Sequence, residues 1–129
     1  MEKITKNQNT KQKFTAFDMD GVIADYHGFV SVDFLGDPKQ EVVKAIKMLK
    51  DLGHKIIVYS TRGTELIKEY CKKHGIPVDY VNENPEKSGL NPYKPIAQVY
   101  VDDRAVCYRD EKAEDLVERI VNFQPYWKE

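Results

Sequence analysis

The sequence lacks any long hydrophobic run and any excess of charge of one sign. Apolar stretches such as residues 56–59 and 99–101 fall far short of the ~20 residues that span a bilayer, so no membrane segment is expected. Lys and Arg number 20 against 21 Asp and Glu. No overall field would therefore attract the chain to nucleic acid or to an anionic membrane, and an anionic ligand would have to be held by local groups.

Two further features are scarce or missing. The N-terminus has no apolar segment followed by a cleavage site of small residues, which excludes a typical secretory signal and predicts a cytoplasmic location. Cysteine occurs only as Cys71 and Cys107, without the CxxC spacing of many metal sites. Because disulfides are rare inside cells, we expect both thiols to be reduced and buried.

The length of the chain sets its domain organisation. With 129 residues and 41% hydrophobic content, it is long enough for one compact core and too short for two ordinary domains. Residues 1–13 are polar and lack hydrophobic periodicity, as in a flexible tail. We expect one domain over residues 14–124 and a short C-terminal tail over residues 125–129.

Short apolar runs alternate with helical patterns along this domain. The alternation predicts an α/β fold, a Rossmann-like three-layer sandwich with a mostly parallel central sheet. One helix has Asp37 as its expected cap, Pro38 at its first position and Gly53 at its end. The predicted strands cover residues 14–17, 55–59, 78–81 and 98–101, and the predicted helices cover residues 38–52, 64–74 and 111–123, the last with its apolar residues on one face.

Polar side chains follow three of the predicted strands at the point where each strand ends. They are Asp18 with Asp20, Ser60 with Thr61, and Asp102 with Asp103. In open parallel sheets the carboxyl ends of the strands form the ligand-binding edge. The sequence therefore predicts a site at this edge.

Four segments in this order carry a resemblance to a known family. They are FDMDGV at 17–22, YST at 59–61, the lysine of KPIA at Lys94, and VDDR at 101–104. Together they resemble the motifs of haloacid dehalogenase (HAD) phosphohydrolases, over about residues 14–123. A DxDG sequence alone is a weak signal, whereas four ordered motifs are specific. Neither connection that holds a cap domain in this family has the length or pattern for one, so the chain resembles the small capless members.

The resemblance implies a magnesium-dependent phosphatase. Asp18 would be the nucleophile that forms an aspartyl phosphate, and Asp20 would protonate the leaving oxygen and then activate water. Mg²⁺, which prefers oxygen ligands, would bind the Asp18 carboxylate, the Asp20 carbonyl and Asp103, while Asp102 would orient metal-bound water. The cation would offset the repulsion between the nucleophile and the phosphate.

Other residues have more open interpretations. The resemblance gives Ser60 and Lys94 catalytic and phosphate-binding roles, with Thr61 and Arg62 as secondary candidates. Taken alone, Ser60 is an ordinary strand-end hydroxyl, and Lys94 more often would be a solvated side chain. Arg104 would pair with substrate or with an acid, with equal weight.

For two segments near these motifs, a structural role is the favoured interpretation. Asp25, Tyr26 and His27 lie where the family folds a flap over the site, and packing or surface roles are slightly favoured over substrate contact. Asn82, Glu83 and Asn84 are expected to form a strand-end turn before Pro85, an interpretation favoured over contact with substrate.

The expected substrate is a small phosphorylated metabolite such as a sugar phosphate. A nucleotidase or a polynucleotide 3′-phosphatase is the alternative within the same chemistry, and the balanced charge does not favour nucleic acid. A homo-oligomer would be one way to close an open site. From another class, a phospho-acceptor signalling domain is disfavoured because its acceptor follows a middle strand. A catalytically silent HAD-like binding module is disfavoured because every motif residue is present.

Overall fold

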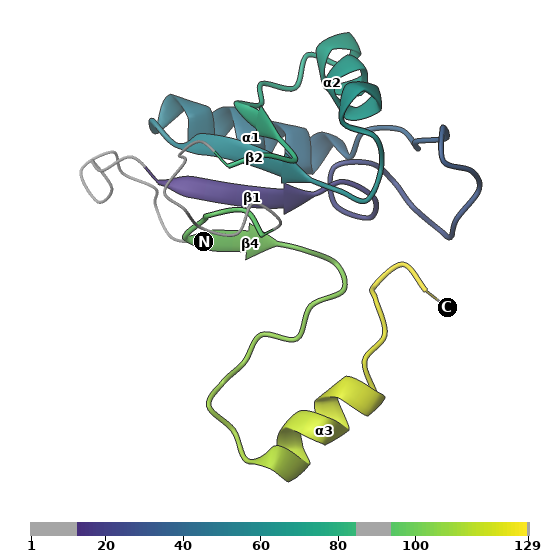
Figure 1. Cartoon of the computed structure of the whole chain (residues 1–129), viewed down its shortest axis with the longest axis vertical. Coiled ribbons are helices and arrows are strands. Elements are labelled where there is room, and N and C mark those ends of the chain that lie inside the picture. The colour runs from purple at the N-terminus through teal and green to yellow at the C-terminus, as the bar shows by residue number, and fades with distance from the viewer. Residues whose placement is uncertain (1–12, 85–93, 129) are drawn as a thin grey trace.

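The computed structural model describes residues 13–84 and 94–128, which form a parallel sheet of four strands in the order β3-β2-β1-β4 and three helices (Figure 1). The strands are β1 (Phe14–Asp18), β2 (Lys55–Tyr59), β3 (Tyr80–Val81) and β4 (Val99–Val101), and the helices are α1 (Gln40–Asp51), α2 (Thr64–Lys73) and α3 (Ala113–Val121). All strand pairs are parallel. The predicted α/β class with a Rossmann-like sheet is confirmed.

The central strand β2 is the most deeply buried. Ile56, Ile57 and Val58 have no exposed surface, and Ile57 pairs in register with Ala16 of β1, which is also fully buried. A strand that is covered on both faces needs apolar residues in succession rather than in alternation. For this reason the continuous apolar run predicted the bounds of β2 correctly.

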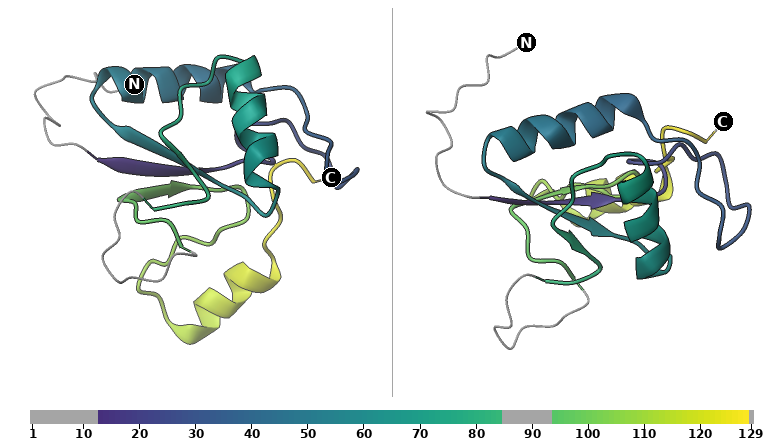
Figure 2. Two further views of the ribbon diagram at one scale, coloured as in Figure 1. Left: turned by 45° about the horizontal axis from the view of Figure 1, so that its top comes forward. Right: turned by 90° about the horizontal axis from the view of Figure 1, so that it is seen from above.

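Helix α1, which lies along one face of the sheet (Figure 2), begins at Gln40 rather than at Pro38. Pro38 forms an extended bridge with the segment that follows β1, and the N–H of Lys39 donates to the carbonyl of Ile23 at 2.7 Å. This pairing holds both residues outside the helix. Lys39 occupies the N-cap without a side-chain hydrogen bond, so the predicted cap by Asp37 is wrong.

The hydrophobic core joins α1 and α2 to the sheet. Its buried members on these elements are Phe17, Val43, Ile46, Ile56, Val58, Ile67, Tyr70, Cys71 and Val81. Burial raises the pKa of the Cys71 thiol to about 11, which keeps it protonated. Cys107 is free and exposed, because it lies in the connection from β4 to α3, outside the core. The prediction of a buried thiol is therefore confirmed for Cys71 and wrong for Cys107.

Strand β3 is shorter than predicted because a side chain takes over part of its pairing. The Asp79 carboxylate accepts a hydrogen bond from the backbone N–H of Ile56 at 2.8 Å and binds the Lys50 ammonium, also at 2.8 Å. Burial alone would raise the pKa of Asp79, but the hydrogen bonds from Lys50 and Ile56 together lower it. The ion pair ties the end of α1 to the sheet.

Helix α3 stands away from the sheet and contacts no other helix or strand of the described chain (Figure 1). Its apolar residues recur at helical spacing, as predicted, but Val117 and Ile120 are each 56% exposed and Val121 is 75% exposed. No helix or strand of the described chain covers this apolar face. Periodicity shows which side chains share a face, and it does not show what covers that face.

Between β1 and α1 the chain forms a flap, residues 25–37, without a helix or a strand. The absence of a cap domain at this point agrees with the prediction. The predicted N-terminal tail, except for Lys13, lies outside the described residues. Within residues 13–84 and 94–128, no helix has both the length and the apolar character needed to cross a bilayer.

Candidate active site

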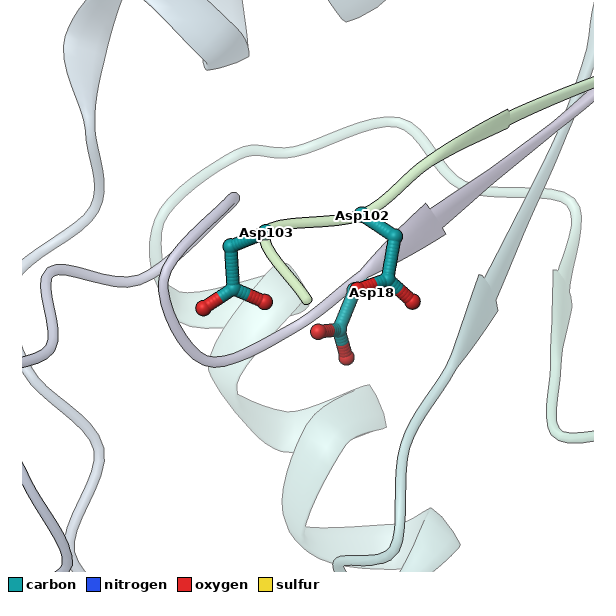
Figure 3. A group of neighbouring side chains, drawn as sticks. All are labelled: Asp18, Asp102 and Asp103. Atoms are coloured by element: carbon teal, nitrogen blue, oxygen red, sulfur yellow. The ribbon is translucent and has the colours of Figure 1, made fainter. Parts of the chain in front are cut away.

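Three carboxylates meet at the carboxyl edge of the sheet (Figure 3). Asp18 ends β1, and Asp102 and Asp103 follow β4. The two strands are neighbours in which Phe17 pairs with Val101, so the residues that follow this pair lie side by side. One oxygen from each carboxylate lies within 4.8 Å of the others, and all three residues line a cavity of about 730 Å³. The parallel register thus joins acids from two distant segments.

Crowding of negative charge governs the protonation of Asp18. Burial and the neighbouring carboxylates of Asp103 and Asp102 raise the pKa of Asp18 to about 8, although the N–H of Met19 donates to its Oδ1 at 2.8 Å and opposes the rise. Three half-buried acids at this separation cannot all ionise without a compensating charge. The cluster is therefore short of positive charge.

The late pair of acids differs in its hydrogen bonds. Asp102 uses both oxygens: its Oδ1 accepts from the backbone N–H of Arg104 at 2.7 Å, and its Oδ2 accepts from the hydroxyl of Tyr59 at 2.8 Å. Burial, together with this bond, raises the pKa of Tyr59, so the hydroxyl remains a donor. Asp103 binds Trp127 Nε1 through Oδ2 at 2.5 Å, while its buried Oδ1 has no partner in the described chain. Asp103 thus keeps a free oxygen.

Glycine is required at position 21 both by the backbone conformation and by the closeness of Asp103. Its φ of +85° lies in the left-handed region, and a Cβ at this position would lie 2.2 Å from Oδ2 of Asp103. A larger residue would displace the Asp103 carboxylate from its position.

Arg62 binds Asp20 rather than standing free in the cavity. Its Nε lies 2.7 Å from Oδ2 of Asp20, and its Nη1 donates to the carbonyls of Ser31 and Val32 of the flap at 2.8 Å each. The Arg62 side chain is only 6% exposed. The other carboxylate oxygen of Asp20, Oδ1, is buried without a partner among the described atoms. These contacts link the expected proton donor to the flap.

The end of β2 supplies hydroxyl groups. Ser60 and Thr61 both line the main cavity, and Ser60 Oγ accepts from the N–H of Arg62 at 3.0 Å, so its own proton is available to a ligand. Asn82, with a φ of +54°, accepts from the N–H of Ser60 at 2.8 Å and donates to Thr64. Asn82 therefore braces this turn, which agrees with its expected structural role.

Lys94 and Arg104, the other basic residues named from the sequence, lie beside aromatic rings. Lys94 Nζ lies 5.1 Å from the centroid of the Tyr100 ring, and Lys94 itself is not among the lining residues of the cavity. Arg104, which does line it, lies 5.1 Å from the ring of Trp127 and 6.0 Å from that of Tyr26.

The C-terminal segment contacts the site. The sequence predicted only a short tail over residues 125–129 and no such contact. Tyr126 donates its hydroxyl proton to the carbonyl of Gly21 at 2.6 Å, and Trp127 binds Asp103. Trp127 also meets Tyr26 edge to face at 4.8 Å. The signal in the sequence is weak: adjacent aromatic residues follow a proline at the end of an otherwise polar segment.

The cluster suits a hard divalent cation. Its donors are all carboxylate oxygens, the ligand type that Mg²⁺ prefers. The unpartnered Oδ1 of Asp103 and the raised pKa of Asp18 are both features that a bound cation would resolve. The residues present therefore fit such an ion.

Comparisons with known proteins establish the fold alone. No family model matches the chain, and no curated protein matches it. Among solved structures it is similar to a conserved protein from Bacteroides thetaiotaomicron, with a TM-score of 0.61 and 23% identity over 86% of this chain and 90% of that chain. A structure from Vibrio cholerae is 19% identical over 84% of this chain and 97% of that chain, with a TM-score of 0.48. The first similarity supports the α/β fold.

Proposed function

We propose that the protein is a magnesium-dependent phosphomonoester hydrolase of the HAD type, with Asp18 as nucleophile and Asp20 as general acid. The observation that carries the proposal is the convergence of three carboxylates, with oxygens within 4.8 Å of one another, in a cavity that Asp20 also lines. Proton transfer to a leaving group requires a second acid that is positioned in the same cavity, and Asp20 lies there outside the cluster. The HAD-like order of the motifs supports the same chemistry.

Mg²⁺ would be held by Asp18, Asp103 and the backbone carbonyl of Asp20. When bound, it would neutralise charge on the phosphate and on the nucleophile. The free Oδ1 of Asp103 favours that residue as the direct ligand, since both oxygens of Asp102 already accept hydrogen bonds. Asp102 would then orient water at the site.

In the first step an oxygen of Asp18 attacks phosphorus, and the bond from phosphorus to the leaving oxygen breaks. The N–H of Met19 holds Oδ1 of Asp18, which orients the carboxylate and favours Oδ2 as the attacking atom. Asp20, fixed through Oδ2 by Arg62, carries the proton on Oδ1 and gives it to the leaving oxygen. An alcohol leaves, and the phosphoryl group stays on Asp18.

In the second step Asp20, now ionised, accepts a proton from water as that water attacks the phosphorus of the aspartyl phosphate. The bond between phosphorus and Asp18 breaks, which releases inorganic phosphate and restores both carboxyl groups. The Ser60 hydroxyl donates to a phosphate oxygen, and Lys94 supplies positive charge if its side chain turns from Tyr100 toward the cavity.

The substrate in this proposal is the phosphomonoester of a small metabolite, and the location is cytoplasmic. Closure of the site by a second copy of the chain stays a prediction.

The test is Mg²⁺-dependent release of phosphate from 4-nitrophenyl phosphate. We expect Asp18→Asn to lose activity by about 1,000-fold or more, because no covalent intermediate forms. Asp33→Asn makes the same chemical change at an exposed flap residue and should retain wild-type activity. Equal rates in wild type and Asp18→Asn would refute the nucleophile assignment.

A further inference from the structure

A second cavity, of about 270 Å³, lies beside the main one. Asp20, Tyr26 and Thr61 line both cavities, and the second is completed by Phe29, Val32, Arg62 and Gly63. Asp20 therefore lies between the two cavities. The main cavity contains the three-carboxylate cluster, and the second cavity is formed by the flap and the end of β2.

The chemistry proposed above determines which part of a substrate would enter each chamber. In an in-line displacement the leaving oxygen lies opposite the attacking oxygen of Asp18. The general acid must touch that leaving oxygen to protonate it. The organic group attached to the oxygen consequently starts next to Asp20 and extends away from the carboxylate cluster, in the direction of the second cavity.

The second cavity has fixed walls. Arg62, with a nearly buried side chain, holds both Asp20 and the flap carbonyls of Ser31 and Val32. At the other end of the flap, Tyr70 donates its hydroxyl proton to the carbonyl of Gly36 at 2.7 Å. The flap is thus tied to the body of the protein at two separate points.

The flap residues line this cavity with apolar surface, and Asp20, Thr61 and Arg62 add polar groups. Tyr26 and Phe29 contribute aromatic rings, Val32 contributes a branched aliphatic side chain, and two of the guanidinium nitrogens of Arg62 are already occupied. Phe29 and Val32 are 68% and 69% exposed, and a bound apolar group would cover part of this surface.

The chemistry of the lining discriminates between classes of substrate. A sugar that extended to the flap surface would leave hydroxyls against Phe29 and Val32, and an unpaired polar group costs roughly 1–3 kcal/mol. The volume is ample for a ring, since an apolar cavity of about 150 Å³ accommodates benzene.

We propose that the cavity between the flap and Asp20 is the subsite for the leaving group, and that it takes an aromatic or apolar alcohol rather than a polyhydroxyl one. This inference rests on the proposed phosphatase function. It narrows the substrate to a phosphomonoester whose organic group is a ring or a short hydrocarbon, and it departs from the sugar phosphate expected from the sequence.

The test compares esters whose leaving groups are all primary alcohols: 2-phenylethyl phosphate, glycerol phosphate and glucose 6-phosphate. We expect kcat/KM of the wild type to favour 2-phenylethyl phosphate by about tenfold or more, the range of small apolar differences in a pocket. In Phe29→Ala and Val32→Ala, the ratio of kcat/KM for 2-phenylethyl phosphate to that for glycerol phosphate should fall several-fold, chiefly through KM.

Val30→Ala is the matched control, because Val30 is an exposed apolar residue of the same flap (65% exposed) that does not line the cavity. Its ratio should equal that of the wild type. Equal use of glucose 6-phosphate by the wild type, or equal shifts in Phe29→Ala and Val30→Ala, would overturn the subsite while leaving the phosphatase proposal intact. If the wild type hydrolysed none of the esters, 4-nitrophenyl phosphate included, both proposals would fall together.

Discussion

Replacement of Asp18 by asparagine should stabilise the metal-free protein even though it abolishes activity. The three carboxylates have oxygens within 4.8 Å of one another. Two unit charges at that separation repel by about 3 kcal/mol at an effective dielectric constant of about 20, and less where water screens them. Because these side chains are only half-buried, we expect a gain of roughly 1–3 kcal/mol in the free energy of unfolding at pH 8.

The gain should depend on pH with a defined sign. The pKa of Asp18 is raised in the folded state to about 8, against about 4 in an unfolded chain. Between these values the folded protein retains a proton that the unfolded protein has released, so the stability of the metal-free wild type falls as pH rises from about 4 to about 8. Asparagine has no proton to lose. The two proteins should therefore unfold alike near pH 4 and diverge toward pH 8.

Mg²⁺ should reverse the order of stability. Ligand at 100 times its Kd stabilises the folded state by about 2.7 kcal/mol. For a chain of this size each kcal/mol raises Tm by roughly 4 °C, so the wild type should gain about 10 °C at pH 8. The gain should shrink at pH 5, because protons compete for the same oxygens. Asp18→Asn, which lacks one carboxylate ligand, should gain little at either pH.

These expectations are tested by measuring the Tm of the wild type and of Asp18→Asn by circular dichroism, with and without Mg²⁺, at pH 5 and at pH 8. Asp33→Asn is the control for loss of one exposed acid and should respond to Mg²⁺ as the wild type does. The reasoning is refuted if Asp18→Asn is less stable than the metal-free wild type at pH 8, or if Mg²⁺ raises the Tm of both proteins equally.

Three further substitutions test contacts around the site and the core. Arg62→Gln should slow hydrolysis of alkyl phosphates by roughly 10–100-fold and hydrolysis of 4-nitrophenyl phosphate much less, because a misplaced Asp20 matters most for poor leaving groups. Equal losses of activity on both types of ester would contradict a positioning role for Arg62. Trp127→Phe keeps a ring but removes the N–H donor to Asp103, so a Mg²⁺ titration of activity should show roughly 10–100-fold weaker metal affinity, and an unchanged midpoint would exclude that role. Asp79→Asn should cost about 1–3 kcal/mol in urea unfolding at pH 7. Because the pKa of Asp79 is lowered on folding, its contribution is full above about pH 4 and declines as pH falls through the lowered value, so a cost that did not decline at all in acid would refute the ion-pair explanation.

Local pattern was sufficient to predict most of the fold. The run at residues 55–59 is apolar at successive positions because a central parallel strand is covered on both faces, and this requirement acts within the strand itself. The acids at the ends of β1 and β4 were predictable for a similar reason. Once two strands are parallel neighbours, their carboxyl ends must lie at one edge.

Contacts between distant segments could not be predicted from the local sequence pattern. The sequence offered Arg62 as a secondary candidate for phosphate binding, whereas its partner in the structure, Asp20, lies 42 residues away in the sequence. The extended bridge at Pro38 overrode a favourable local pattern for the start of a helix, because pairing with the segment after β1 competes for the same backbone. Both outcomes depend on how the flap folds back over the sheet.

The sequence by itself determined the strands, the helical faces and the set of acids at the sheet edge, because each depends on short-range periodicity and on parallel pairing. Only the tertiary structure decided that Trp127 reaches Asp103, that Asp103 rather than Asp102 retains a free oxygen, and that α3 stands clear of the sheet. These features arise where side chains from remote segments meet, and their hydrogen bonds depend on three-dimensional packing rather than on the spacing of residues along the chain.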